Sequence, residues 1–342
     1  MRTVLLDINN LFSRCKYAIK ESDKDVFIPL VANGMFGMIK EIMNRFKPDR
    51  YIAFCDGNGS WRKLVYPQYK ANRTQTDKTA KEIERDEMAM EFLRKEFVPF
   101  LKEKTSMPVV DGELLEADDL IATYTYMFPD DLNIICSTDG DFIQLLTDTT
   151  CIYNSMEERF ITKNGLYDTK TGKAIHFETK DGKIKVNREI CYVEQGEEMV
   201  PFSNWIDYSL FVKCIRGDKS DNILSAYPRI TEKTTKTNIG LKEAFDSLSS
   251  DGFAWNNFMK KVWKDMLGEE HIVEKEYLKN KLLIDLKMLP TDMRNNAIRV
   301  INEQLNKKKP EEIYRNLCKF FKKYGLQNLL DNVDAINEPY TR

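Results

Sequence analysis

Short apolar runs and longer stretches with helical spacing alternate along the first half of the chain. Arg2–Leu6, Arg50–Cys55 and Leu132–Cys136 are short runs rich in residues that favour strands. Pro29–Phe46 instead carries apolar residues at helical spacing. Strands that alternate with long helices predict an α/β fold built on a parallel sheet.

Acidic residues follow the predicted strands. Asp7 and Asp56 come directly after the first two runs, and Asp139 comes three positions after the third. A single Asp at such a place is weak evidence, because loops also use Asp in turns and helix caps. In parallel α/β sheets, ligands bind beyond the carboxyl ends of the strands. We therefore expect these three residues to converge at one edge of the sheet.

Two acidic groups lie on either side of the third strand. Glu116, Asp118 and Asp119 begin an apolar helical stretch, and Asp139 and Asp141 follow the strand. An acidic first turn also complements the helix dipole, but three acids in four residues exceed that need. Like charges so close destabilise a fold unless a cation neutralises them. Carboxylate oxygens suit hard divalent cations, so the pattern predicts a metal site.

Composition excludes several other kinds of chemistry. The 342 residues allow two domains or one large one, and only two of them are histidine, His176 and His271. This scarcity argues against zinc or non-haem iron enzymes and against Ser-His or Cys-His nucleophiles. Seven cysteines without a Cys-x-x-Cys pair fit reduced thiols. No run approaches the roughly 20 apolar residues of a membrane span, so we expect a cytoplasmic protein that binds no membrane.

A basic and aromatic segment follows Asp56. The net charge is -2, so the chain as a whole is not basic. Cations meet phosphates, and aromatic rings stack on unpaired bases. A solvated charged surface, with the rings as core anchors, would produce the same pattern. The residues of this segment that we expect to contact nucleic acid are Trp61, Arg62, Lys63, Tyr69, Lys70 and Arg73.

Segment lengths suggest how the chain is organised. Residues 57–108 are too long for a simple connection, and Thr79–Lys104 has the spacing of one amphipathic helix, so we expect a helical gateway over the metal site. Turn-rich residues 151–200 predict a β-rich insertion without chemistry of its own. The α/β domain that carries the metal site would then span 1–205, and a helical region that binds nucleic acid and includes the C-terminus would span 206–342.

A further acidic pair, Asp218 and Asp221, follows the helix predicted at Asp207–Arg216. Two acids three residues apart could complete the metal site. A helix start capped by Ser220 or Asp221 would give the same string.

Taken together, these motifs resemble the 5′-to-3′ exonuclease and flap endonuclease family, most closely its T-even phage ribonuclease H branch. The strings that carry the resemblance are Asp7, Cys55–Gly57, Tyr69–Arg73, Glu116–Asp119, Ser137–Asp141 and Gly217–Asn222. The phage branch adds Asp139–Leu145 and Lys279–Asp285. The resemblance implies a PIN-like nuclease core with a parallel sheet, a helical gateway and a mostly helical C-terminal region.

The resemblance also implies two Mg²⁺ ions, for which Mn²⁺ would substitute. The first ion would be held by Asp7, Asp56, Glu116, Asp118 and Asp139, and the second by Asp119, Asp141, Asp218 and Asp221. Lys70 and Arg73 would act beside the scissile phosphate, with Asp118 as a catalytic metal ligand, and Tyr69 would meet the terminal base. Paired metals and nearby cations suit an in-line displacement at phosphorus.

One motif departs from the family pattern. Many members have a glycine-bearing hairpin that grips duplex phosphates, but Pro228–Thr234 lacks those glycines. Three cations, Arg229, Lys233 and Lys236, would replace that grip electrostatically.

By resemblance, the chain is a Mg²⁺-dependent 5′ nuclease with ribonuclease H and flap endonuclease activity. It would act as a monomer on RNA:DNA hybrids and on flap or nicked duplex DNA, removing primers and flaps during lagging-strand replication. A single-strand-binding protein and a sliding clamp are implied partners, although no clamp-binding peptide is evident before the first strand. A phage origin would place it in the host cytoplasm.

Two alternative functions remain open. A PIN-type ribonuclease shares the sheet and the acidic edge, but the long gateway and the Asp218–Asp221 motif argue against it. A structure-specific nucleic-acid binder without catalysis would gain nothing from clustered acids near DNA.

Overall fold

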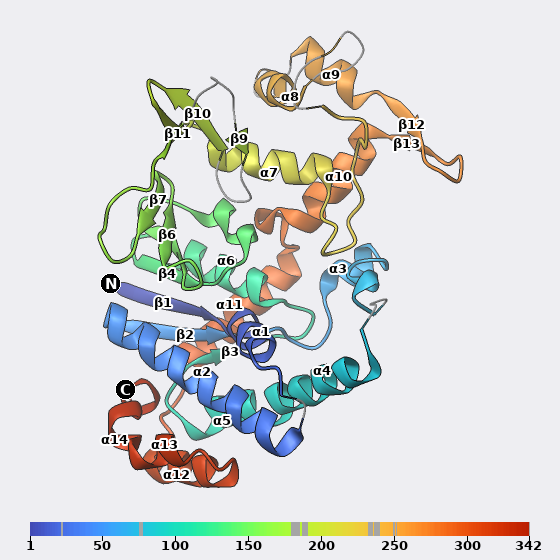
Figure 1. The fold of residues 1–342 in the computed structure, drawn as a ribbon. Helices are drawn as coiled ribbons and strands as arrows, with labels where there is room; N and C mark the ends of the chain where they lie inside the picture. The colour runs from blue at the N-terminus through green and yellow to red at the C-terminus, as the bar shows by residue number, and fades with distance from the viewer. Residues whose placement is uncertain are drawn as a thin grey trace.

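A mixed seven-stranded sheet forms the centre of the chain in the computed structural model (Figure 1). The structure describes residues 1–21, 23–74, 78–178, 185–186, 191–231, 235, 240–248, 250 and 252–341. Strands β3, β2, β1, β4 and β5 run parallel in that order, and β6 and β7 continue the sheet antiparallel. The strands are β1 Arg2–Asp7, β2 Arg50–Phe54, β3 Val109–Val110, β4 Leu132–Cys136, β5 Thr150–Asn154, β6 Arg159–Thr162 and β7 Gly165–Asp168. The predicted α/β class and its three strands are confirmed.

Two hydrophobic cores cover the two faces of the sheet, because successive side chains of a strand point to opposite sides. Leu5 belongs to the first core, whereas Val4 and Leu6 belong to the second. Helices of the first core are α6 Ala117–Met127, α7 Trp205–Arg216, α8 Leu241–Leu248, α9 Phe253–Met259, α10 Val273–Ile284 and α11 Thr291–Leu305. Helices of the second are α1 Ile8–Ala18, α2 Lys24–Phe46, α4 Ala80–Phe92, α5 Val98–Lys104, α12 Ile313–Lys323, α13 Gln327–Asp331, α14 Val333–Ile336 and α15 Glu338–Thr341.

Helix α2 is the central helix of the second core. Its Phe36 is fully buried and makes edge-on contacts with the rings of Phe97, Phe321 and Tyr340. By length and composition alone, α2 could also cross a bilayer. Burial of its apolar residues against the sheet and the C-terminal helices accounts for the same hydropathy.

The segment expected to form a gateway is helical. It contains α3 Trp61–Val65, the 3₁₀ turn η1 Ala71–Thr74, α4, the π-helical stretch η2 Leu93–Phe97 and α5. Helices α4, η2 and α5 follow one another without a break, as the spacing of Thr79–Lys104 predicted. Thr79 begins this run with a capping box to Glu82.

The β-rich region has two parts. Strands β5 to β7 extend the central sheet, while β8 Phe177–Glu178, β9 Lys185–Val186, β10 Cys191–Gln195 and β11 Glu198–Pro201 form a separate antiparallel sheet. The prediction of one local insertion over 151–200 therefore missed the parallel pairing of β5 with β4. The composition of β5 shows that the segment favours a strand, but it does not show which other strand it pairs with.

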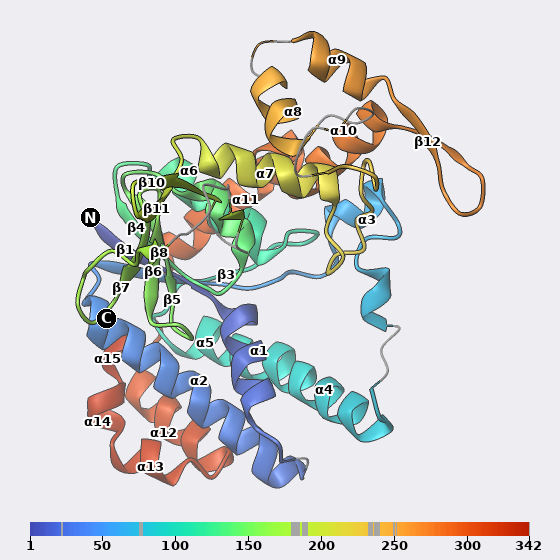
Figure 2. The ribbon, with the colours of Figure 1, turned by 45° about the horizontal axis from the view of Figure 1, so that its top comes forward.

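The C-terminal helices do not share one unit with the helices after residue 205. Helices α12 to α15 pack beside α2, whereas α7 to α11 cover the other face of the sheet (Figures 1 and 2). Both cores thus cross the division expected at 205/206. Lys323 pairs with Glu96, and Lys307 donates to backbone carbonyls of the α5 end. These C-terminal lysines therefore lie on the α2 and α5 side of the sheet.

Candidate active site

Three neighbouring strands bring acidic residues to one edge of the sheet. Asp7 ends β1 and accepts hydrogen bonds from Ser137 Oγ (2.8 Å) and from the backbone N–H of Asn10 (3.1 Å). Asp56 follows β2 and accepts from Asn9 Nδ2 and from the N–H of Ala117, both at 2.9 Å. The strand order β2-β1-β4 explains why residues so distant in sequence meet here.

Asp118 is the least neutralised carboxylate of this edge. No hydrogen bond from a described residue reaches it. Burial, followed by the charges of Asp139, Asp7 and Asp141, holds its pKa well above the usual range. Burial likewise raises the pKa of Asp7 to about 7, with smaller contributions from Asp56 and Asp139. Asp7, Asp118, Asp139 and Asp141 therefore lie close enough to repel one another, and a bound cation would relieve that repulsion.

Asp119 lies away from this group, contrary to its predicted role as a ligand of the second ion. It is fully buried, and both of its oxygens are occupied. Arg62 bridges to it with two nitrogens at 2.8 and 3.1 Å, and Trp61 Nε1 and the N–H of Glu116 each donate at 3.1 Å. The carboxylate therefore anchors α3 to the start of α6.

Trp61, Arg62 and Tyr69 were predicted to contact nucleic acid, and that prediction is wrong. Their exposed fractions are 3%, 3% and 2%. Arg62 also pairs with Glu116 and donates Nε to the carbonyl of Leu283. The rings pack in the first core, which was the alternative interpretation of the same pattern.

Lys70 reaches the acidic edge from the gateway. Its Nζ lies 2.5 Å from Glu116 Oε1, and its backbone takes the left-handed conformation with φ of 57°. Such a φ is costly for a side chain larger than glycine and is common at functional sites. Burial lowers the Lys70 pKa, but Glu116 and Asp221 outweigh it and the pKa is raised, so the ammonium stays charged.

Residues 68–73 of the gateway are fastened to the loop 217–223, and we call this set of contacts the clasp. The backbone N–H of Lys70 donates to the carbonyl of Asp221 at 2.8 Å. Two asparagine side chains cross in opposite directions, Asn72 to the carbonyl of Lys219 and Asn222 to that of Gln68, both at 2.7 Å. The clasp sets the position of Lys70 over the acids.

Both oxygens of Asp221 belong to the clasp. One accepts from Arg73 at 2.8 Å and the other from Tyr69 Oη at 2.9 Å. No helix begins here, so the capped-helix interpretation is wrong. Instead Asp218 and Ile223 pair across a tight turn. Gly217 begins that turn with φ of 73°, and an added Cβ would lie 2.3 Å from the carbonyl oxygen of Ile223.

Lys213 is a site residue that the sequence analysis missed. It projects from α7, forms an ion pair with Asp141, and lies 2.8 Å from Asp218 Oδ2. Chiefly through Lys213, after the opposing effect of burial, the pKa of Asp218 falls to about 2. The available signal was its position five residues before Asp218, at the end of a predicted helix.

The acidic residues fit hydrated divalent cations. Their possible ligand atoms are all carboxylate oxygens, and no residue that the structure describes donates a hydrogen bond to Asp118. Among the described residues of this edge, no three bring carboxylate oxygens within 4.8 Å of one another. Mg²⁺ keeps several of its bound waters, so carboxylates that lie too far apart to contact the ion directly can still hold it through those waters. Lys70 and Lys213 are cationic side chains that contact acids of this edge, Lys70 at Glu116 and Lys213 at Asp141.

The other predicted contacts to nucleic acid lie on the surface. Lys63, Arg73 and Arg229 are exposed. Arg73 keeps 57% of its side chain accessible despite its bond to Asp221. Lys233 and Lys236 lie outside the described residues, so their role stays a prediction.

The two phage-branch strings contact each other. Gln144 of the first donates to the carbonyl of Ile284 (3.2 Å) and accepts from the N–H of Leu286 (2.8 Å). Asn280 of the second is fully buried and donates to the carbonyls of Cys214 and Leu224. These residues hold α10 against the elements that carry the acids.

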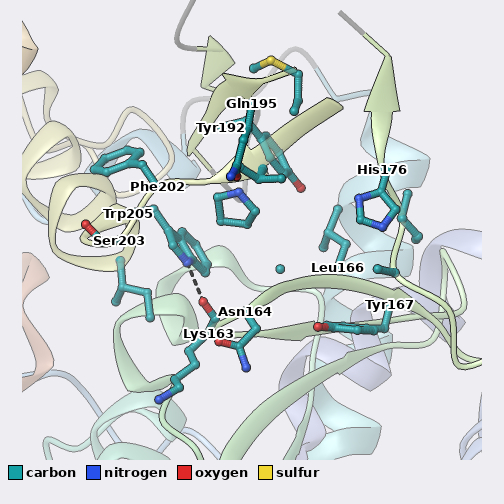
Figure 3. A pocket seen from close by; sticks show the side chains of 17 residues that line it. Lys163, Asn164, Leu166, Tyr167, His176, Tyr192, Gln195, Phe202, Ser203 and Trp205 are labelled. Atoms are coloured by element: carbon teal, nitrogen blue, oxygen red, sulfur yellow. Dashed lines mark hydrogen bonds between the residues drawn. The ribbon is translucent and has the colours of Figure 1, made fainter. Parts of the chain in front are cut away.

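Two cavities differ in their relation to the acids. One of about 670 Å³ opens beside Asp56 and is lined also by Asn9, Asn58 and Arg94. The other, of about 540 Å³, lies between the β6–β7 hairpin and β10–β11 (Figure 3). In it, Trp205 donates to the carbonyl of Lys163 at 2.8 Å (Figure 3). Only the first adjoins the acidic edge.

Comparison with known proteins agrees with this geometry. Residues 2–172 match the model of the 5′-3′ exonuclease N-terminal resolvase-like domain. A 5′-3′ exonuclease of Mycoplasmopsis pulmonis (strain UAB CTIP) is 26% identical over 338 residues, which cover 94% of this chain and 93% of that protein. Flap endonuclease Xni of Psychromonas ingrahamii is 26% identical over 173 residues, 48% of this chain and 60% of that protein.

Solved structures share the fold. Bacteriophage T5 D15 flap endonuclease, in a product complex with DNA and metal ions, aligns with a TM-score of 0.56 and 18% identity, covering 90% of this chain and 100% of that one. T5 5′-exonuclease with bound zinc aligns with a TM-score of 0.59 and 19% identity, covering 89% and 98%.

Proposed function

The chain belongs to the 5′-3′ exonuclease family and is a nuclease, and on this premise we propose that it is a Mg²⁺-dependent 5′ nuclease. It cleaves 5′ flaps and shortens 5′ ends of DNA duplexes and RNA:DNA hybrids, removing primers and flaps in lagging-strand replication. The observation that carries the proposal is the convergence of four carboxylates, Asp7, Asp118, Asp139 and Asp141, with Lys70 at their side.

The carboxylates and Lys70 have different tasks. Asp7, Asp56, Asp118 and Asp139 would hold one ion directly or through water, and Asp141 and Asp218 would hold the second. Bound divalent ions supply an activated water and stabilise the leaving oxygen. Lys70 donates to a non-bridging oxygen of the scissile phosphate and offsets the charge that develops there. It leaves Glu116 when the phosphate arrives.

Substrate position follows from the clasp and from the cavity at Asp56. Arg73, 57% exposed beside Asp221, meets the phosphate next to the cut. The cavity of about 670 Å³ is large enough for a nucleotide, since ligand pockets span about 300–1,000 Å³. Arg94, exposed on the π-helical stretch, provides a cation at its wall. Single-strand nucleic acid entering beneath α4 would reach the acids by this route.

Activity on RNA primers, beside activity on DNA, is supported by the resemblance of Asp139–Leu145 and Lys279–Asp285 to the phage branch. The same resemblance supports a replication role, a single-strand-binding protein and a sliding clamp as partners, and a monomer in the host cytoplasm.

The test uses three labelled substrates: a 5′-flap DNA, a nicked duplex, and an RNA primer on DNA. Each is incubated with the wild type in Mg²⁺ and in EDTA, and with Asp118→Asn and Lys70→Ala. Lys95→Ala is the matched control, because Lys95 is an exposed cation paired with Glu91 at 2.8 Å on a helix of the same gateway. We expect short 5′ products that require Mg²⁺, vanish in Asp118→Asn, and fall sharply in Lys70→Ala only.

Other outcomes would point to the alternatives. Cleavage of single-stranded RNA that is indifferent to Lys70 would favour a PIN-type ribonuclease. Tight flap binding without cleavage in Mg²⁺ or Mn²⁺ would favour a binding protein.

A further inference from the structure

The hairpin of β12 Val262–Lys264 and β13 Glu270–Ile272 carries a second cluster of ligating groups. Asp265, Glu269 and His271 each bring one ligand atom within 4.8 Å of the others, a convergence found nowhere else in the described part of the chain. The hairpin projects from the helices around α9 and α10 (Figures 1 and 2). Unlike the acidic edge, this cluster combines carboxylates with an imidazole.

The imidazole of His271 is held in place from two sides. Its Nδ1 lies 3.0 Å from Glu276 Oε1 on α10, outside the cluster. Its ring stacks on Trp263, with 4.4 Å between the ring centroids. Histidines that bind metals usually have their second ring nitrogen on such a carboxylate, which fixes the tautomer and aims the ligating nitrogen. Glu276 would therefore be a positioning residue.

The remaining nitrogen points into the cluster, where the carboxylate of Asp265 is its neighbour. Nε2 of His271 is shielded from solvent and lacks a hydrogen-bond partner. It lies 3.6 Å from Asp265 Oδ2, too far for a hydrogen bond. Two ligands about 2.1 Å from one tetrahedral ion lie about 3.4 Å apart, so the spacing suits a shared metal. The other oxygen of Asp265 accepts from the N–H groups of Leu267 and Glu269, leaving Oδ2 to face the imidazole.

We propose that Asp265, Glu269 and His271 bind one transition-metal dication, with Zn²⁺ the best match, at a site separate from the nuclease centre. One imidazole nitrogen and two carboxylate oxygens are donors that Zn²⁺ accepts, whereas Mg²⁺ prefers oxygen alone. A water completes the tetrahedron. The ion joins the turn to β13 and stiffens the hairpin tip, where Met266 and Leu267 are exposed.

The test measures Zn²⁺ binding to the full chain in excess Mg²⁺, by competition with a chromophoric chelator. The wild type is compared with His271→Gln, and with His176→Gln as control, since His176 is the only other histidine and lies 3.3 Å from Glu198 on a different sheet. Any Zn²⁺ at the nuclease centre is common to all three. We expect His271→Gln alone to lose one equivalent, and Glu276→Gln to bind it about 10–100-fold more weakly.

Thermal unfolding supplies a second readout that does not use activity. Zn²⁺ should raise the Tm of the wild type and of His176→Gln more than that of His271→Gln or Asp265→Asn. Equal stoichiometry in the wild type and His271→Gln would overturn the proposal and leave a protonated imidazole paired with Asp265. Far-UV circular dichroism of each variant confirms that the fold is kept.

Discussion

Replacement of Asp119 by asparagine should destabilise the chain without removing a metal ligand. The Asp119 carboxylate is fully buried and accepts four hydrogen bonds, two of them from Arg62. Asparagine keeps the shape but removes the charge that neutralises the guanidinium. It also turns one acceptor into an N–H donor facing other donors.

The loss of folding free energy in Asp119→Asn can be estimated from the contacts of Arg62. Loss of one partner from a buried ion pair costs about 3–5 kcal/mol. Arg62 keeps Glu116 at 2.9 Å, so we expect the lower value, about 3 kcal/mol. Unfolding entropy of about 2.1 cal/mol/K per residue gives about 0.7 kcal/mol/K for this chain. The Tm should therefore fall by about 4 °C.

The assay is calorimetric unfolding in EDTA, followed by Mg²⁺ titration of the folded variant. Asp118→Asn is the matched control, because it is one residue away and makes the same chemical change. Within the described part of the chain Asp118 accepts no hydrogen bond, and it faces three like charges, so its replacement should leave the Tm unchanged or raise it while abolishing cleavage. If Asp119→Asn keeps its Tm but loses Mg²⁺ binding, Asp119 is a ligand and the reasoning fails.

Three further predictions concern the acidic edge and the clasp. Lys70→Ala should lower kcat about 10²–10³-fold with little change in flap affinity, measured by single-turnover cleavage and by binding in Ca²⁺. Because the pKa of Asp7 is about 7 when folded and lower when unfolded, the metal-free protein should gain stability as pH falls from 8 to 5; a Tm series in EDTA should be flatter for Asp7→Asn. Gly217→Ala should cost more than 1 kcal/mol and weaken cleavage, because its Cβ would meet the carbonyl of Ile223. Gly196→Ala, with a similar φ but open space, should cost less and leave cleavage intact.

Local sequence determined the sheet and the acids at its edge. Short apolar runs and period-3.6 apolar patterns depend on few neighbours, so the strands at Arg2 and Arg50 and the long helix from Thr79 could be predicted directly. Asp7, Asp56 and Asp139 follow strands, and parallel topology then requires their convergence. The sequence therefore predicted the edge at which these acids lie, and the strand order β2-β1-β4 made them neighbours.

Tertiary packing decided which charged and aromatic residues remain available. Trp61, Arg62 and Tyr69 have the composition of a nucleic-acid surface, yet they are buried because Asp119, Glu116 and the carbonyl of Leu283 satisfy them. The partner of a charge can lie more than 200 residues away, and a local pattern carries no information about it.

The same reason explains the other corrections. The sequence around Asp218 and Asp221 fits a capped helix start as well as a pair of metal ligands. Their position in a turn became clear only from the contacts of that turn with residues 68–73. In the sequence, Lys213 is one of several cations of a predicted helix. Only the packing of α7 shows that it forms an ion pair with Asp141. Sequence determines which groups can do the chemistry, whereas long-range contacts determine which of them face the substrate and which hold the fold.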